Sequence, residues 1–374
     1  MKVDYLIVGS GLTGAVIART LADAGREVVV VDRRSHMGGN VHDHAHCSGI
    51  RVHTYGPHYF RTSCDRIWEW ATRFGQFYRY EAAVISDVSG ELVQWPLSAD
   101  YIGRTVGLSW SPEFLGDPTN LEEAALSLMP RKIYDQFVKE YNEKQWGVAC
   151  TNLSASLCSR FDVRKSEDAR LTPHAKHQGL PVEGYAEWTR RMLAGIPVML
   201  NYDYLQRREE IKARQCLVFT GPIDEFFRFD MGRLEYRGQK RSHEYFEHAN
   251  FVQRRGQVNN PLHSGGEHIR TLEWKHMMPP SLGNRITGSI VTKETPFSPS
   301  SPSEYEYPFP SLKNTTYSLY RKRADLLEKV VIAGRLGEYR YMDMDQAIGR
   351  AMKLADKMIG KQHKAAKHHY AQKE

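Results

Sequence analysis

The first forty residues contain the pattern that most limits what this chain can fold into. Residues 3–8 form an apolar, β-branched run that is typical of a buried parallel strand. The turn Gly9-Ser10-Gly11-Leu12-Thr13-Gly14 follows at once, and residues 15–22 have helical character. A second strand, residues 28–31, ends at Asp32. This order of strand, glycine turn, helix, strand and acid predicts a dinucleotide-binding Rossmann unit.

Each glycine of the turn has a physical reason to be there. We expect Gly9 to permit the tight turn, Gly11 to let a pyrophosphate approach the backbone, and Gly14 to bring the helix close to the strand. The helix N-terminus offers free N–H groups and a positive dipole end to the phosphate, and Asp32 stands where an acid takes the ribose hydroxyls. The predicted cofactor-binding residues of this unit are Gly9, Gly11, Leu12, Thr13, Gly14 and Asp32.

The residues after Asp32 favour FAD over a nicotinamide dinucleotide. The segment 33–40 reads Arg-Arg-Ser-His-Met-Gly-Gly-Asn, at a point where a nicotinamide domain usually enters its second helix. It resembles the acid, short basic stretch and Gly-Gly of flavoproteins of the glutathione-reductase and amine-oxidase type. We therefore add Arg33, Gly39 and Asn40 to the cofactor-binding residues. The alternative is a Gly-Gly loop that binds no ligand.

The charge balance of the chain is basic, with a formal net charge of +7. Part of this charge lies in the tail 361–374, which we expect to be solvated, and the remainder is compatible with a cleft for an anionic substrate. No basic stripe with interleaved aromatic residues is localised enough to predict nucleic-acid binding.

Cysteine usage and hydropathy place the chain in a reducing compartment. The five cysteines are scattered, odd in number and without a CxxC pair, so we expect neither a disulfide scaffold nor a metal site. No apolar run is long enough to span a membrane, and the sequence opens directly into a predicted strand rather than a secretory signal. We therefore expect a cytoplasmic protein.

The order of the patterns predicts an α/β protein with a discontinuous cofactor domain. Strands that end in glycine recur near residues 215–221 and 329–334, a hairpin is predicted around Val88-Ser89-Gly90, and residues 98–160 have helical rather than strand patterning. The polar segment 171–179 lacks periodicity and is either a mobile loop or a connector. We predict a Rossmann-like FAD-binding domain (1–82, 184–225 and 328–360), a helical insertion (98–160) with a mobile substrate loop (about 160–180), an antiparallel substrate sheet (83–97 and 226–320) and the tail.

Several motifs make a more specific resemblance. Residues 141–147, Tyr-Asn-Glu-Lys-Gln-Trp-Gly, resemble the Y-T-E-K-Q-W-G segment of bacterial UDP-galactopyranose mutases. In the same register lie Thr220-Gly221-Pro222, residues 234–237, residues 291–294, Gly334-Arg335-Leu336 and residues 339–345. The chain is similar to this family from Val3 to about Met358, which is nearly its full length.

The resemblance implies an activity that spacing alone does not. It implies FAD that is active in its reduced form and interconverts the pyranose and furanose rings of a nucleotide sugar, through a covalent flavin N5–sugar adduct and without net redox change. The protein would supply positioning and electrostatics for this chemistry. It also implies a nucleotide-diphosphate sugar as substrate, NAD(P)H or another reductant for the flavin, and a homodimer.

The resemblance assigns site residues position by position. Arginine suits a departing diphosphate because it stays charged and grips two oxygens. Arg160 matches the family's mobile-loop arginine, Arg270 the second diphosphate arginine, and Arg335 an arginine beside the isoalloxazine. The implied catalytic residues are Arg160, Arg270, Asp343 and His58. The implied substrate-binding residues are Tyr141, Trp146, Arg237, Tyr307 and Tyr341, and Arg61, Arg335, Tyr341 and Met344 are added to the cofactor-binding residues.

Without the motifs, each of these residues has a plainer interpretation. Arg160 and Arg270 would be exposed surface arginines, the aromatic residues would be packing groups, and Asp343 would be the N-cap of a closing helix.

Three positions depart from the family pattern. Arg61 stands where the family's H-x-F-H-T segment has its second histidine, and a permanent cation cannot shuttle a proton at neutral pH. Leu171 replaces a loop tyrosine, and Trp274 replaces a residue that is usually histidine. These changes leave open another sugar or another base. An FAD-dependent amine oxidase or desaturase, or a non-catalytic flavin-binding relative, is the alternative reading.

Overall fold

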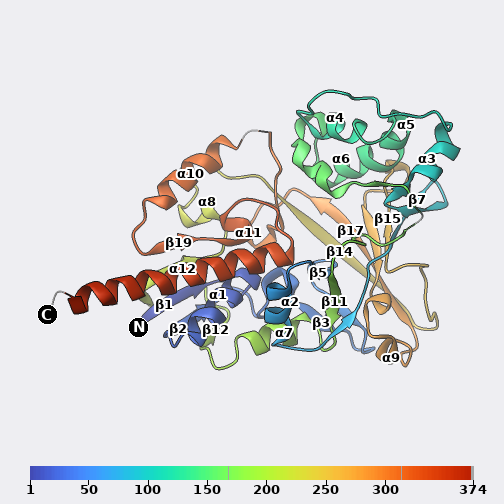
Figure 1. The fold of residues 1–374 in the computed structure, drawn as a ribbon. Coiled ribbons are helices and arrows are strands. Elements are labelled where there is room, and N and C mark those ends of the chain that lie inside the picture. Colours follow the sequence, from blue (N-terminus) through green and yellow to red (C-terminus); the bar gives the residue numbers. More distant parts are fainter. Residues whose placement is uncertain (167, 313, 372–374) are drawn as a thin grey trace.

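The cofactor domain is built on a parallel sheet whose strands come from the beginning, middle and end of the chain (Figure 1). The computed structural model describes residues 1–166, 168–312 and 314–371, without the side chains of Arg160 and of residues beyond 360. The sheet order is β12-β2-β1-β13-β19, with all neighbours parallel. The strands are β1 (Lys2–Val8), β2 (Val28–Val31), β12 (Val198–Met199), β13 (Lys212–Phe219) and β19 (Val330–Ile332).

Side chains of β1 enter two different cores, and the register of the strand shifts between Val3 and Tyr5. Tyr5 and Ile7 pack with helices α1 (Leu12–Asp23) and α12 (Met344–Ala371), whereas Val3 and Leu6 pack with α8 (Ile223–Phe226) and α10 (Thr315–Asp325). Because both faces are covered, residues 28–31 of β2 and 217–219 of β13 are apolar and buried, as expected for the centre of a parallel sheet. The predicted α/β fold class and Rossmann-like unit are confirmed.

A second, seven-stranded sheet lies beside the first domain (Figure 1). Its order is β18-β14-β17-β16-β15-β7-β8, and its pairs are antiparallel except β7 with β15. The predicted hairpin at 88–90 is confirmed, and it joins the later strands through that one parallel pair. The strands are β7 (Val84–Val88), β8 (Glu91–Trp95), β14 (Tyr236–Phe246), β15 (Gln257–Asn259), β16 (Arg270–Glu273), β17 (Ser289–Phe297) and β18 (Tyr307–Pro308).

The helices between β9 and β10 have a core of their own. Ile102, Leu121 and Ile133 pack with Trp146 in this core and against Val93 of the hairpin. The Ser98 hydroxyl and the Asn120 side chain cap the first two helices by accepting backbone N–H groups. The elements are α3 (Ala99–Val106), α4 (Leu121–Leu126), α5 (Arg131–Tyr134), the π-helical turn η2 (Asp135–Lys139), α6 (Glu140–Trp146), η3 (Cys150–Asn152) and η4 (Ala155–Arg160).

The polar segment 171–179 contains a strand that the sequence pattern did not predict. Strand β11 (His177–Pro181) is the centre of a small antiparallel sheet, between β5 (Phe60–Thr62) and β6 (Phe77–Arg79). His177 also stacks on Trp68 at 4.9 Å. The strand was missed because its partners are short and distant in sequence, so pairing rather than periodicity defines it.

The remaining elements connect these layers. They are β3 (Asp43–Ala45), β4 (Arg51–His53), β9 (Leu97–Ser98), β10 (Val163–Arg164), α2 (Asp65–Thr72), α7 (Tyr185–Met192), α9 (Pro280–Gly283), α11 (Gly334–Gly337), η1 (Gly39–Val41), η5 (His263–Gly265), η6 (Trp274–Met277) and η7 (Pro302–Glu304). Within the described part of the chain, every helix is too short or too polar to serve as a membrane span.

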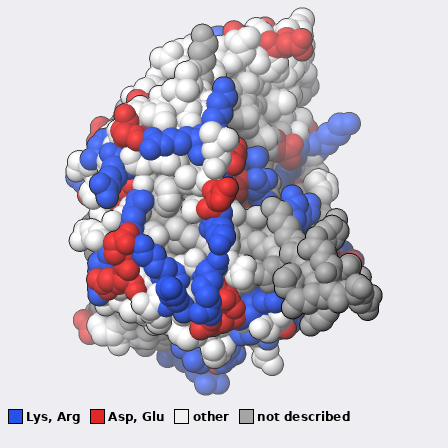
Figure 2. Space-filling model, turned by 90° about the vertical axis from the view of Figure 1, so that its left-hand side faces the viewer, with Lys and Arg blue, Asp and Glu red and all other residues white. Residues whose placement is uncertain are grey.

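The surface in Figure 2 carries basic and acidic side chains side by side, with no single-sign stripe among the residues that are coloured. Charges of opposite sign often pair on this protein, as in Arg207–Glu210 and Arg321–Asp325, both at 2.6 Å. Such exposed pairs contribute little to stability.

Candidate active site

The glycine turn forms a cradle in which each glycine has a different neighbour. A Cβ on Gly14 would lie 1.9 Å from the Gly9 carbonyl oxygen, and one on Gly9, where φ is +103°, would lie 2.1 Å from the Thr220 hydroxyl oxygen. A Cβ on Gly11 would meet only the Cα of Gly39, at 3.7 Å. Packing therefore requires Gly9 and Gly14, whereas Gly11 faces space that an outside group can approach.

The N-terminus of α1 is open at this cradle. Gly11 is its N-cap, and no side chain among the described residues accepts a hydrogen bond from the first N–H groups of the helix. These groups and the helix dipole suit a phosphate. Gly11 and Gly38 also form a backbone bridge, which brings the two predicted glycine segments together. The residues present therefore fit the diphosphate of a dinucleotide cofactor.

Asp32 and the two arginines after it have unequal roles. Oδ2 of Asp32 accepts hydrogen bonds from the Ser10 amide and hydroxyl, both at 2.7 Å, and Oδ1 accepts from the Arg34 amide. The carboxylate thus braces the turn. Arg33 makes a bidentate pair with Glu225 at 2.8 and 2.6 Å. Arg34, which the sequence reasoning did not select, binds Asn40 and lies 3.9 Å from a Cβ built on Gly39.

The end of the chain closes on the same cradle. At Gly334, where φ is +82°, a Cβ would lie 3.3 Å from the Thr13 hydroxyl oxygen. Arg335 follows, 5.2 Å from the Tyr307 ring and 5.9 Å from the Tyr341 ring. These two rings are nearly parallel, 6.4 Å apart. The structure therefore brings Thr13, Arg335, Tyr307 and Tyr341 to one place.

Two buried carboxylates link two arginines of the seven-stranded sheet. Glu294 on β17 lies directly opposite Arg241 on β14 and Arg270 on β16, so all three side chains share one face of the sheet. Glu294 Oε1 accepts from Arg241 Nε at 2.8 Å, and Oε2 accepts from Arg270 Nε at 2.6 Å. Arg241 also binds Glu306 through Nη1 and Nη2, at 2.8 and 2.7 Å. We call Arg270, Glu294, Arg241 and Glu306 the charge relay.

The relay keeps its charges although it is buried. Burial opposes the charge of Glu294, whose side chain is 0% exposed, but the two guanidiniums outweigh it and hold the pKa of Glu294 below its ordinary value. The same pairing raises the pKa of Arg270 against the effect of burial. The relay is therefore a fixed set of ions at neutral pH.

Arg270 is the member of the relay with donors to spare. Its side chain is 15% exposed, so it is not an ordinary surface arginine. Only Nε donates to a partner among the described residues, which leaves the fork of Nη1 and Nη2 without one. Tyr141 and Tyr307 are close enough to affect its pKa. This arrangement can receive an anion with two oxygens.

Helix α6 holds the predicted aromatic residues against the sheet. Trp146 packs edge-on against Tyr307 and Phe309, at 6.5 and 6.0 Å between ring centres. Arg237 donates to the carbonyl oxygens of Gln145 and Lys144 and to the Ser298 hydroxyl. Its contacts therefore anchor the end of α6, and a contact of Arg237 with substrate stays a prediction.

Three other predicted residues lie around the segment 58–61. Nδ1 of His58 lies 2.8 Å from the Gly56 carbonyl oxygen, and burial together with nearby cations lowers its pKa to about 3. His58 is therefore neutral at physiological pH. Arg61 forms an ion pair with Asp343 at 3.0 Å, and Asp343 immediately precedes Met344, the first residue of α12. Two positions chosen separately from the sequence are thus partners.

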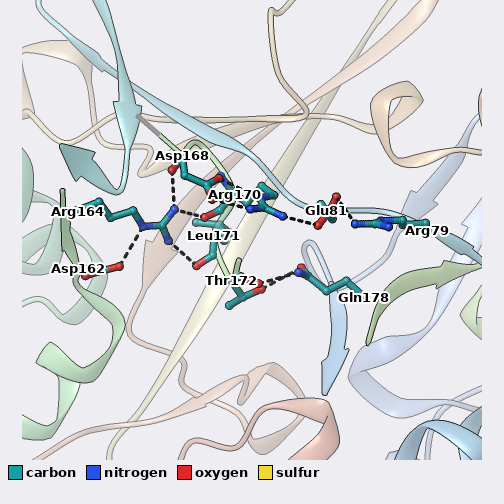
Figure 3. Close-up of polar contacts among 9 residues, drawn as sticks. All are labelled: Arg79, Glu81, Asp162, Arg164, Asp168, Arg170, Leu171, Thr172 and Gln178. Carbon is teal, nitrogen blue, oxygen red and sulfur yellow. Dashed lines mark hydrogen bonds and ion pairs between the residues drawn. The ribbon is translucent and has the colours of Figure 1, made fainter. Parts of the chain in front are cut away.

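The side chain of Arg160 lies outside the described residues, but the segment after it is described except for position 167. Figure 3 shows Arg164 in contact with several residues of this segment. Arg164 donates to the carbonyl oxygens of Asp168, Arg170 and Leu171 and to the Asp162 carboxylate. Arg170 links Asp168 to Glu81. Leu171 thus contributes its backbone carbonyl oxygen to the contacts of Arg164.

The sequence reasoning did not select five residues that lie at this site, namely Arg34, Arg241, Glu294, Glu306 and Tyr59. The hydroxyl of Tyr59 donates to Gln257 at 3.1 Å. Charge at alternating positions of the predicted strands is typical of a sheet with one solvated face, so this pattern does not mark the charges as buried. It does not say which charges pair.

Comparison with known proteins decides the family. A profile described as UDP-galactopyranose mutase matches residues 136–341, and one described as an NAD(P)-binding Rossmann-like domain matches residues 7–74. A probable UDP-galactopyranose mutase of Klebsiella pneumoniae is 30% identical over 372 residues, covering 95% of this chain and 94% of that protein. The chain belongs to the UDP-galactopyranose mutase family. The dTDP-fucopyranose mutase of Escherichia coli is 29% identical, over 95% of this chain and 98% of its own.

Solved structures show the same fold. A crystal structure of reduced UDP-galactopyranose mutase has a TM-score of 0.74 at 15% identity, covering 96% of both chains. Cyclohexylamine oxidase from Brevibacterium oxydans has a TM-score of 0.66 at 12% identity, covering 96% of this chain and 99% of its own, and is a distant relative in fold.

Family membership confirms the resemblance predicted from the motifs. The chain is a flavin-dependent isomerase of the intramolecular transferase class, its cofactor is FAD, and its substrate is a nucleotide sugar. The cradle, with Leu12, Thr13, Gly39 and Asn40 at its edge, would hold this cofactor.

Proposed function

We propose that this enzyme interconverts the pyranose and furanose forms of a nucleotide-diphosphate sugar, either UDP-galactose or a close analogue. The observation that carries the proposal is the free guanidinium fork of Arg270, which is held by a buried carboxylate and flanked by two tyrosines. A ring contraction must release and recapture a diphosphate, and a fixed bidentate cation suits that task. Relatives named for UDP-galactose and for dTDP-fucose have similar identities, so both substrates are tested.

The roles of the other residues follow from the same proposal. When bound and reduced, FAD would supply N5 as a nucleophile for the anomeric carbon, with no net redox change. Arg270 holds the departing diphosphate, assisted by Arg160 and by the hydroxyls of Tyr141, Tyr307 and Tyr341. Trp146 stacks near the nucleoside, and Arg335 favours a negative charge on the reduced ring. His58 is neutral, so it contributes no positive charge and acts by positioning the groups next to it.

The experiment is a direct assay of ring interconversion. The purified protein is checked for a flavin absorbance spectrum, reduced with dithionite, and incubated separately with UDP-galactofuranose and dTDP-fucofuranose. We expect the pyranose form of at least one substrate, resolved by chromatography, and no turnover by the oxidised protein. Absence of flavin, or of product from both substrates, would contradict the proposal.

The amine-oxidase alternative is tested by the same preparation. A cationic amine would meet the cations of the relay, which disfavours its binding. Hydrogen peroxide production from amines by the oxidised protein would instead support that alternative. An NAD(P)H-type reductant, a homodimer and a cytoplasmic location stay predictions.

A further inference from the structure

Arg241 has a position in the relay that differs from that of Arg270. Nε of Arg241 donates to Glu294, Nη1 and Nη2 donate to the two oxygens of Glu306, and Nη1 also approaches the Gln239 carbonyl oxygen at 3.3 Å. Its side chain is 9% exposed. Each nitrogen of Arg241 thus serves a protein oxygen, and these bonds use four of its five N–H donors.

At one end of the relay, Glu294 determines the orientation of Arg270. Glu294 is held by Arg241 through one carboxylate oxygen and holds Arg270 Nε through the other. A carboxylate that is fixed on one oxygen cannot turn about its own axis without losing that bond. The plane of the Arg270 guanidinium, and thus the direction of its free fork, depends on Arg241.

At the other end of the relay, Glu306 contacts Arg335, which the family resemblance places beside the flavin. The backbone carbonyl oxygen of Glu306 accepts a hydrogen bond from Arg335 Nη2 at 2.6 Å. Tyr307, the next residue, lies against the Arg335 guanidinium. Arg241 therefore connects the side chain that would hold the diphosphate to the wall beside the flavin.

We propose that Arg241 is a positioning residue for the reaction, acting through Glu294 on Arg270 and through Glu306 on Arg335 and Tyr307. This inference rests on the proposed function. The inference requires directed hydrogen bonds as well as a positive charge. A lysine at this position would keep the charge but could not make the three directed bonds to the Glu294 and Glu306 carboxylates.

The test is a double-mutant cycle on the FAD-loaded protein with Arg241→Lys, Arg270→Lys and both together. Binding of UDP and of dTDP is measured by calorimetry, alongside kcat, KM and flavin content. We expect Arg241→Lys to keep its flavin and to weaken binding of the tighter nucleotide at least tenfold. We expect the double variant to bind no more weakly than the poorer single variant, since both changes remove one arrangement.

Glu273→Gln provides the matched control. Glu273 is a fully buried carboxylate on the same strand as Arg270, and it accepts from the Val252 and Gln253 amides and the Ser289 hydroxyl rather than from the relay. We expect this variant to lower the melting temperature while nucleotide affinity stays within twofold of wild type.

Three results would overturn the inference. These are wild-type affinity in Arg241→Lys, additive losses in the double variant, or an equal loss of affinity in Glu273→Gln. Failure of the wild-type flavoprotein to bind either nucleotide would overturn the proposed function as well, so the two failures are distinguishable.

Discussion

The cradle and the charge relay solve the same problem, the placement of phosphate-binding groups, by opposite means. The cradle uses backbone N–H groups at the start of α1 and consists of residues close in sequence. The relay uses buried side-chain ions from β14, β16 and β17 and the residue before β18, which are joined only by the register of the sheet.

The cradle and the relay tolerate different amino-acid substitutions. The cradle depends on the absence of side chains, so its weak points are glycines whose Cβ would touch backbone. The relay depends on complete pairing, because removing one partner leaves an uncompensated buried charge, at a cost of about 3–5 kcal/mol. The predictions below test that contrast.

The largest effect is expected within the cradle itself, between Gly14→Val and Gly11→Val. At Gly14 the new side chain would meet the Gly9 carbonyl, so we expect loss of soluble protein or destabilisation of about 3 kcal/mol or more. At Gly11 the Cβ meets nothing closer than 3.7 Å, so we expect a folded protein that lacks FAD. Thermal unfolding and flavin absorbance measure the two outcomes. Normal flavin content in Gly11→Val would show that the phosphate does not approach this turn.

Arg270→Ala is expected to have the largest effect in the relay. It removes the free fork and leaves Glu294 with one partner, so turnover should fall about 100-fold or more while the cradle keeps its flavin. Steady-state kinetics and flavin content check this together. Loss of flavin in parallel with activity would mean that the two regions are not independent.

Acid should destabilise the fold through the buried histidine His53. His53 is buried, and burial together with Arg51 lowers its pKa to about 3. Between pH 6.5 and 3 the unfolded chain binds a proton that the folded chain refuses, so stability falls as pH falls. The loss from this residue is about 2 kcal/mol at pH 5. Urea unfolding at pH 7.5 and 5 measures it, and His53→Asn should show a smaller difference between the two pH values.

Gly56→Ala is expected to have a smaller effect than these. Gly56 has φ of +87°, and a Cβ there would lie 2.7 Å from Glu294 Oε1 and 3.3 Å from Arg241 Nη2. We expect kcat/KM to fall about tenfold, equivalent to about 1.4 kcal/mol, because the relay must shift. Gly90→Ala is the control, since Gly90 has φ of +92° and nothing within 4 Å. Equal losses of kcat/KM in both variants would mean that backbone strain alone causes the effect.

How far the sequence was sufficient differs between the two regions. In the cradle it predicted the strand, the turn, the helix and the distinct part of each glycine, but it did not select Arg34, which lies at the Gly39 loop. A contact of Arg33 with the cofactor stays a prediction. Neighbouring arginines look alike in sequence, and the bidentate partner of Arg33, Glu225, lies far along the chain. Around the relay it selected Arg270, Tyr307 and Arg335 through the family motifs. It did not select Glu294, whose carboxylate holds Arg270, or Glu306, whose backbone carbonyl binds Arg335.

The features that could be read from the sequence are those whose contacts lie within a few residues, such as the glycine turn, the apolar strands and the hairpin. A local contact leaves a local pattern, because backbone geometry and side-chain period act over short distances. Pairing across strands leaves no such pattern. That Glu294 faces Arg241 on one side and Arg270 on the other follows from the order β14-β17-β16 and its register, and these come from how the whole sheet assembles.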